Sequence, residues 1–77
     1  MKVDVQLLGP LSRFSPTENE KFQLDVEAGG TVAQLLEKIK LPEDVEKVVL
    51  VNGVRSNLSS RLAEGDDVFI FTPAAGG

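Results

Sequence analysis

The chain has 77 residues, no Cys and no His, and 12 acidic against 8 basic residues, a formal net charge of −4 at pH 7. This length allows one small domain, with too few residues for both a core and a deep substrate cavity. The missing thiols and imidazoles exclude disulfides, cysteine catalysis and the commonest general base and metal ligand. We therefore expect no catalytic residue and no metal site.

Charge and hydropathy also restrict the partners. Nucleic-acid binding needs a cationic surface, and residues 41–77 alone carry a net charge of −3. These acidic side chains are interpreted either as a solvated face or as a surface for a basic protein. The longest apolar run, Val48–Val51, is far shorter than the roughly 20 residues of a membrane span. The N-terminus also lacks a signal-peptide pattern. We expect a cytoplasmic protein, monomeric when free, with no nucleic-acid or membrane partner.

The first part of the chain predicts two strands joined by a long loop. Apolar and polar residues alternate over residues 2–8 and again over residues 21–26, as in strands with one buried face. Residues 9–20 contain Gly, Pro and hydroxyl residues without a sustained period, which is typical of a loop. Within this loop, Leu11 and Phe14 are expected to contact the core.

A helix is predicted after Gly29-Gly30. Thr31 and Gln34 have the spacing of a capping box, in which each side chain accepts a hydrogen bond from the other residue's backbone. Pro42 disfavours helical geometry at the preceding residue and ends the helix. The helix has one apolar stripe, formed by Val32, Leu35, Leu36 and Ile39.

A β-hairpin is predicted next. Val48–Val51 is apolar without alternation, which fits a strand covered on both faces or one whose outer face meets a partner. Asn52-Gly53 is a strong hairpin signal because both residues tolerate positive φ. Val54-Arg55 gives a short returning strand. Leu58 and Leu62 are expected to anchor the irregular segment that follows.

The last strand is predicted over residues 67–72, with apolar residues on both faces. Its alternation places Val68 and Ile70 on one face and Phe69 and Phe71 on the other. One helix covers one face of a sheet, so large apolar side chains on the other face mark a binding surface. The alternative is that all four Phe residues belong to the core. The predicted class is α+β, a mixed sheet of four to five strands packed on one main helix.

The chain changes character at Pro73, after which every residue is small. We assign residues 1–72 to the domain and residues 73–77 to a flexible, extended tail, which spans at most roughly 17 Å. Glycines have no Cβ atom, so the end of the tail can enter a narrow channel of another protein. The one distinctive group that it would deliver there is the carboxylate of Gly77. The alternatives are a frayed end or a cloning remnant.

Several motifs together indicate a family. They are Gly30-Thr31-Val32 at the helix start, Val51-Asn52-Gly53, the turn Glu64-Gly65-Asp66 and the terminal Gly76-Gly77. With these, the chain resembles the ubiquitin-like β-grasp sulfur carriers of the MoaD/ThiS family, which includes the molybdopterin synthase small subunit. The resemblance covers nearly the whole chain.

The resemblance implies a carrier without catalytic activity of its own. Gly77 would be adenylated with ATP by an E1-like partner enzyme and converted to a thiocarboxylate. Its sulfur would then be transferred in molybdopterin synthesis, with the synthase large subunit or an analogous enzyme as acceptor. No cofactor would be bound by the chain itself. Entry of the tail into the partner would involve Pro73, Ala74, Ala75 and Gly76. By resemblance to ubiquitin, partners would dock on Phe71, Phe69 and Leu50.

Two departures leave the pathway open. Molybdopterin-type members often have an aromatic-Ala…Leu-Arg pattern after the first strand, where this chain has the different residues 9–14. They also often have Pro-Pro before the tail, where this chain has Thr72-Pro73. The long segment 9–20 still favours molybdopterin or tungstopterin synthesis over the shorter thiamine type. The alternatives are a thiamine-type or other sulfur carrier, a ubiquitin-like modifier that is joined to lysines, and a plain interaction domain.

Overall fold

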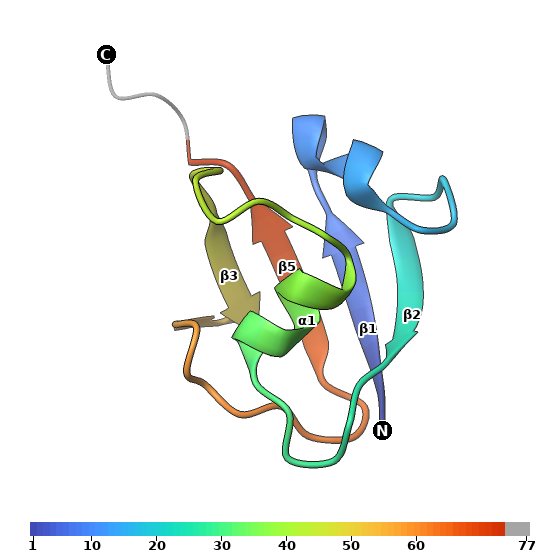
Figure 1. Cartoon of the computed structure of the whole chain (residues 1–77), viewed down its shortest axis with the longest axis vertical. Helices are drawn as coiled ribbons and strands as arrows, with labels where there is room; N and C mark the ends of the chain where they lie inside the picture. Colours follow the sequence, from blue (N-terminus) through green and yellow to red (C-terminus); the bar gives the residue numbers. More distant parts are fainter. Residues whose placement is uncertain (74–77) are drawn as a thin grey trace.

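The computed structural model describes residues 1–73. Within this range the elements are β1 (Lys2–Leu7), the 3-10 helix η1 (Gly9–Phe14), β2 (Lys21–Asp25), α1 (Val32–Lys38), β3 (Val48–Val51), β4 (Val54–Ser56) and β5 (Asp67–Phe71). The strands of this part form one five-stranded sheet, and α1 crosses one of its faces (Figure 1). The predicted α+β class is confirmed. The predicted flexibility of the tail concerns residues that lie almost wholly outside the described part.

The sheet is mixed, in the order β2-β1-β5-β3-β4. β1 pairs antiparallel with β2 and parallel with β5, and β3 pairs antiparallel with both β4 and β5. The last strand in the chain is therefore the central strand of the sheet. A parallel pair needs a long crossover connection, and the segment between β1 and β5 provides it.

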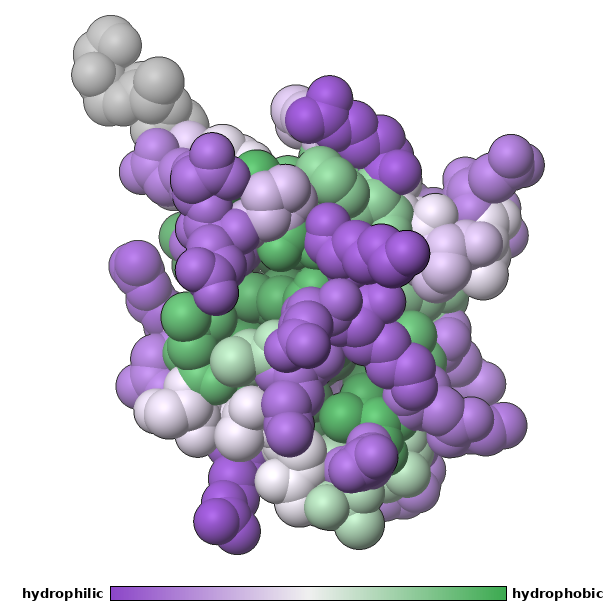
Figure 2. Space-filling view, in the orientation of Figure 1, coloured by the Kyte–Doolittle hydropathy of each residue, from purple (hydrophilic) through white to green (hydrophobic). Residues whose placement is uncertain are grey.

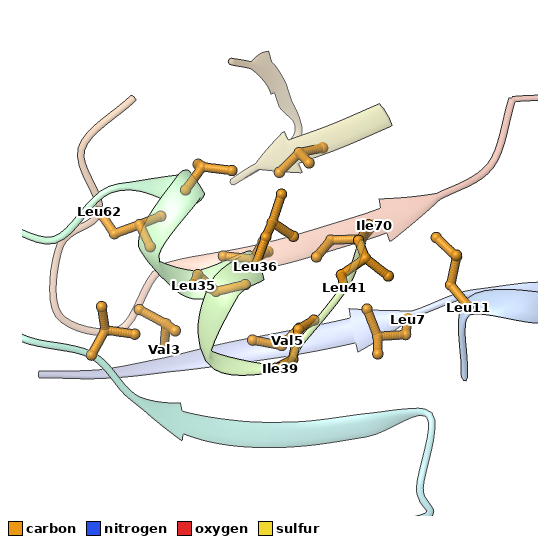
Figure 3. Packing of buried hydrophobic residues seen from close by; sticks show 14 of the residues in the cluster. Val3, Val5, Leu7, Leu11, Leu35, Leu36, Ile39, Leu41, Leu62 and Ile70 are labelled. Atoms are coloured by element: carbon orange, nitrogen blue, oxygen red, sulfur yellow. The ribbon is translucent and has the colours of Figure 1, made fainter. Parts of the chain in front are cut away.

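The core lies between α1 and the sheet (Figure 3). Each strand contributes the side chains of one face, because successive side chains point to opposite faces. The predicted stripe of α1 is buried throughout, and no polar or charged side chain within residues 1–73 is buried. Figure 2 shows the face that carries α1, where hydrophilic side chains cover much of the surface and apolar surface lies between them. The most deeply buried side chains are Val3, Val5, Leu7, Val32, Leu35, Val68 and Ile70.

Both ends of α1 are fixed by hydrogen bonds. The capping box is present: Thr31 N–H donates to Gln34 Oε1 (2.9 Å), and Gln34 N–H donates to Thr31 Oγ1 (3.4 Å). At the other end, Lys40 takes a positive φ of 59°. Its N–H donates to Glu37 O (3.0 Å), and Leu41 N–H donates to Leu36 O (3.0 Å), which is a Schellman motif. A short helix is thereby closed at both ends before Pro42.

The structure differs from the sequence predictions in two segments. The first part of the predicted loop 9–20 is a 3-10 helix, because Pro10 is placed at its start and Leu11, 3% exposed, packs into the core. Leu62 is buried as expected, but the Leu58 side chain is 52% exposed, so that prediction was wrong. Leu58 is instead fixed through its backbone, whose carbonyl accepts a hydrogen bond from Ala33 N–H (3.0 Å).

Candidate functional site

The face of the sheet opposite α1 carries an apolar patch. Leu50 on β3 lies opposite Phe69 on β5, and Val48 lies opposite Phe71. Alternation along each strand puts all four on the side away from α1. Phe69 is 38% exposed, Leu50 and Phe71 are half-buried, and Val48 is 9% exposed. We call Val48, Leu50, Phe69 and Phe71 the outer patch.

The four phenylalanines have different environments. Phe22 belongs to the core and Phe14 packs against it. Phe69 and Phe71 are not part of that cluster, because Val68 and Ile70 occupy the buried face of β5. The interpretation that every Phe is a core residue was therefore wrong. The three residues predicted to dock a partner, Leu50, Phe69 and Phe71, are brought together on one face, and Val48 is a neighbour that the sequence analysis did not single out.

Charged residues lie at both edges of the outer patch. Across the sheet, Arg55 on β4 lies opposite Leu50, and Gln6 on β1 lies between Phe69 and Lys21 on β2. These cross-strand neighbours form a row from Arg55 to Lys21 that is cationic at its two ends and apolar in the middle. A shallow hollow on this face is lined by residues that include Gln6, Lys21, Leu50, Asn52, Asp67 and Phe69. The sequence alone did not indicate Arg55, Lys21 or Gln6, because only the strand register brings them to the patch.

The β3–β4 turn is joined to the start of β5 by side-chain hydrogen bonds. Asn52 Nδ2 donates to Asp66 Oδ1 (2.8 Å), and Asn52 Oδ1 accepts from Asp67 N–H (2.9 Å). Asp66 Oδ2 in turn accepts from Ala63 N–H (2.8 Å). We call Asn52, Asp66 and Asp67 the Asn52 clasp. It holds together two turns that the sequence analysis treated separately.

The end of β5 is held by the segment before η1. Leu8 N–H donates to Ile70 O (3.0 Å), which fixes the backbone next to Phe71. Pro73 is the last described residue and is half-buried. The predicted site residues Ala74, Ala75, Gly76 and Gly77 lie outside the described residues. The six residues that follow Phe71 reach at most roughly 20 Å when extended.

Neither a membrane helix nor a metal cluster is found within residues 1–73. No helix of this part is long and apolar enough to cross a membrane. In the same part, no group of three or more Asp or Glu side chains is arranged to hold a metal ion.

A mixed sheet in this strand order, packed on one helix, defines a ubiquitin-like β-grasp domain. The model of the ThiS family matches residues 5–77. This match covers well over half of the chain, so the chain belongs to the ThiS family. The family resemblance drawn from the sequence motifs is confirmed.

Solved structures share the fold at low sequence identity. The H. volcanii small archaeal modifier protein 1 is 22% identical with a TM-score of 0.78, covering 95% of this chain and 98% of that chain. A putative molybdopterin converting factor subunit 1 from Pyrococcus furiosus is 23% identical, TM-score 0.78, over 95% and 98% of the two chains. A complex of subunits 1 and 2 of the molybdopterin-converting factor from Helicobacter pylori contains a chain 22% identical, TM-score 0.67, over the full length of both chains. Comparison with curated proteins gave no match.

Proposed function

We propose that the chain is a sulfur carrier for molybdopterin synthesis, with Gly77 as the residue that bears the sulfur. The observation that carries the proposal is that the ThiS family match extends over residues 5–77 and so includes Gly76-Gly77. The similarity to molybdopterin converting factor subunits from two organisms supports this pathway over thiamine synthesis.

The chemistry takes place on partner enzymes. A carboxylate at neutral pH is a poor electrophile, so the Gly77 carboxylate first attacks the α-phosphorus of ATP and displaces pyrophosphate. A sulfide nucleophile then attacks the acyl carbon of the adenylate and displaces AMP, which leaves a thiocarboxylate. The chain supplies the reacting group and its delivery, while an E1-like enzyme supplies the ATP site. Tethering gives the terminal group a high effective concentration in the receiving site.

The outer patch docks the domain while the tail enters the partner. Phe69, 38% exposed, is the large aromatic side chain available for burial, and Leu50 and Phe71 border it. Aromatic residues in the centre of an interface carry much of the binding energy, and charged residues at the rim set orientation. Arg55 and Lys21 stand at the two edges, and Asp4 and Asp67 lie on the same face beside Gln6 and Phe69. The partner surface is therefore expected to be apolar in the middle, with acidic groups opposite the two cations and basic groups opposite the two aspartates.

The test is the intact mass of the purified chain after incubation with the activating enzyme from the same organism, ATP and a sulfide donor. A sulfur carrier gains the mass difference between sulfur and oxygen, and fragmentation places this gain on Gly77. The Gly77→Ala variant is the matched control. Its added methyl group must pass the partner's channel, so its gain in mass should be reduced or lost. An unchanged mass in the complete mixture, with active enzyme, would overturn the proposal.

A protein modifier is the second candidate, favoured by the similarity to a small archaeal modifier protein. The same adenylate would then be attacked by a lysine amine to give an isopeptide bond. Conjugates of higher mass, formed in cells and lost when Gly76-Gly77 is deleted, identify this function. A thiocarboxylate on Gly77 without any conjugates identifies the carrier alone.

A further inference from the structure

The Asn52 clasp holds a chemically labile pair of residues. Asn52 is exposed, has a φ of 53° and is followed by Gly53. Asparagine is a thermolabile residue. A glycine after it has no Cβ that would hinder the approach of the glycine backbone nitrogen to the asparagine side chain. In an unrestrained chain the Gly53 nitrogen therefore reaches the Asn52 side-chain carbon readily.

The reaction consumes water and releases ammonia. The backbone nitrogen of Gly53 loses its proton and attacks Cγ of Asn52, and the carboxamide nitrogen takes up a proton and leaves as ammonia. Water then opens the cyclic imide at one of its two carbonyls. The product is aspartate if the original main chain is restored and isoaspartate if the chain now runs through the side chain.

We propose that Asn52 is a site of spontaneous deamidation, and that the Asn52 clasp sets the rate. Attack requires the carboxamide to rotate towards Gly53, but both of its polar atoms are held, one by the Asp66 carboxylate and one by Asp67 N–H. The folded chain therefore reacts through the fraction of molecules in which the clasp is open. Such local openings are less costly than global unfolding in exposed turns.

The other asparagines of the chain are internal references. Asn19 precedes Glu20 and Asn57 precedes Leu58, so the next residue in both cases has a side chain that hinders attack. The Asn57 side chain is also held, since its Oδ1 accepts from Ser59 N–H (3.0 Å). Deamidation is thus expected first at Asn52.

Either product disturbs the edge of the outer patch. An aspartate at position 52 has no donor for Asp66 and places a second carboxylate where a hydrogen bond of 2.8 Å now lies. Isoaspartate lengthens the main chain inside a two-residue turn, and Val51 and Val54 are paired on either side of that turn. A shift of this register moves Arg55 relative to Leu50. Modification at one exposed turn thereby changes the surface of the neighbouring strands.

The experiment follows the purified full-length chain during incubation at constant pH and temperature, with peptide mapping by mass spectrometry. Conversion is measured separately at positions 19, 52 and 57, in buffer and in denaturant. We expect Asn52 to react first and to react faster in denaturant, where the clasp is absent. Asp66→Ala removes one partner of the carboxamide, and we expect it to accelerate the native reaction by roughly fivefold.

Asp67→Ala is the matched control. It removes the same charge from the adjacent position but retains the backbone N–H that binds Asn52, so the rate should stay close to that of the unmodified chain. Equal rates for the two variants overturn the role of the clasp. Equal rates at Asn52 and Asn57, or equal rates at Asn52 in buffer and denaturant, overturn the proposal even if Asp66→Ala fails to fold.

Discussion

Phe69 illustrates how an aromatic residue can be tested for a role in binding. Its side chain is 38% exposed and lies on the face opposite α1, whereas Phe22 is 8% exposed and belongs to the core. We expect Phe69→Ala to lower the free energy of unfolding by about 1–2 kcal/mol, because its side chain is only partly covered and its removal leaves no cavity in the core. Phe22→Ala should lower it by about 3–5 kcal/mol. Urea denaturation measures both.

The Phe69→Ala variant also tests whether the outer patch docks the partner. Phe69→Ala should slow adenylation by the activating enzyme at limiting carrier concentration while the fold is retained. A normal rate with this variant would show that the outer patch is not the docking surface.

Lys40 is a residue in a backbone conformation that glycine adopts more easily. Its φ of 59° lies in the left-handed region, where a side chain is disfavoured, and it follows the last turn of α1. We expect Lys40→Gly to raise the free energy of unfolding by about 0.5–1 kcal/mol. Glu37→Gly, within the helix and also exposed, should lower it by about 1 kcal/mol. A loss of stability with Lys40→Gly would contradict the assigned conformation.

At the scale of the element, α1 depends on its N-cap residue, Thr31, because the helix has only seven residues. Short helices gain little from intrinsic propensity, so one satisfied backbone group is a sizeable part of their stability. We expect Thr31→Ala to destabilise the fold by about 1 kcal/mol in urea denaturation. Thr31→Ser keeps the accepting oxygen and should restore most of the loss. Equal destabilisation by both variants would assign the effect to the lost methyl group rather than to the cap.

Elements with a local signal were predictable from the sequence, and those fixed at long range were not. Thr31 and Gln34 gave the helix start because a capping box spans only four residues, and Asn52-Gly53 gave the hairpin for the same reason. The parallel pairing of β1 with β5 has no local signal, because the partners are about sixty residues apart in the chain. The contact between Asn52 and Asp66, which are 14 residues apart, was also missed, because each turn was predicted from its own local residues.

For the whole molecule, the core and the tail are expected to be independent. Within residues 1–73 the last residue of the core cluster is Ile70, seven residues before the end of the chain. We therefore expect deletion of Gly76-Gly77 to leave the urea midpoint unchanged and to abolish adenylation. Ile70→Ala, by comparison, should lower the free energy of unfolding by about 2–5 kcal/mol. A clear fall in the midpoint on deletion would show that the tail contributes to the fold.

The position of β5 also determines when during synthesis the chain becomes able to fold. Before β5 is made, the β1–β2 and β3–β4 pairs have no strand between them, and the sheet is divided into two hairpins that are marginal on their own. Pairing between segments far apart in sequence is also slow, because the entropy of closing the long intervening loop is lost before the contacts form. A polypeptide interrupted before residue 67 consequently lacks the central strand together with Phe69 and Phe71. Incomplete products of translation are thus unable to display the outer patch and compete with the finished chain for its partners.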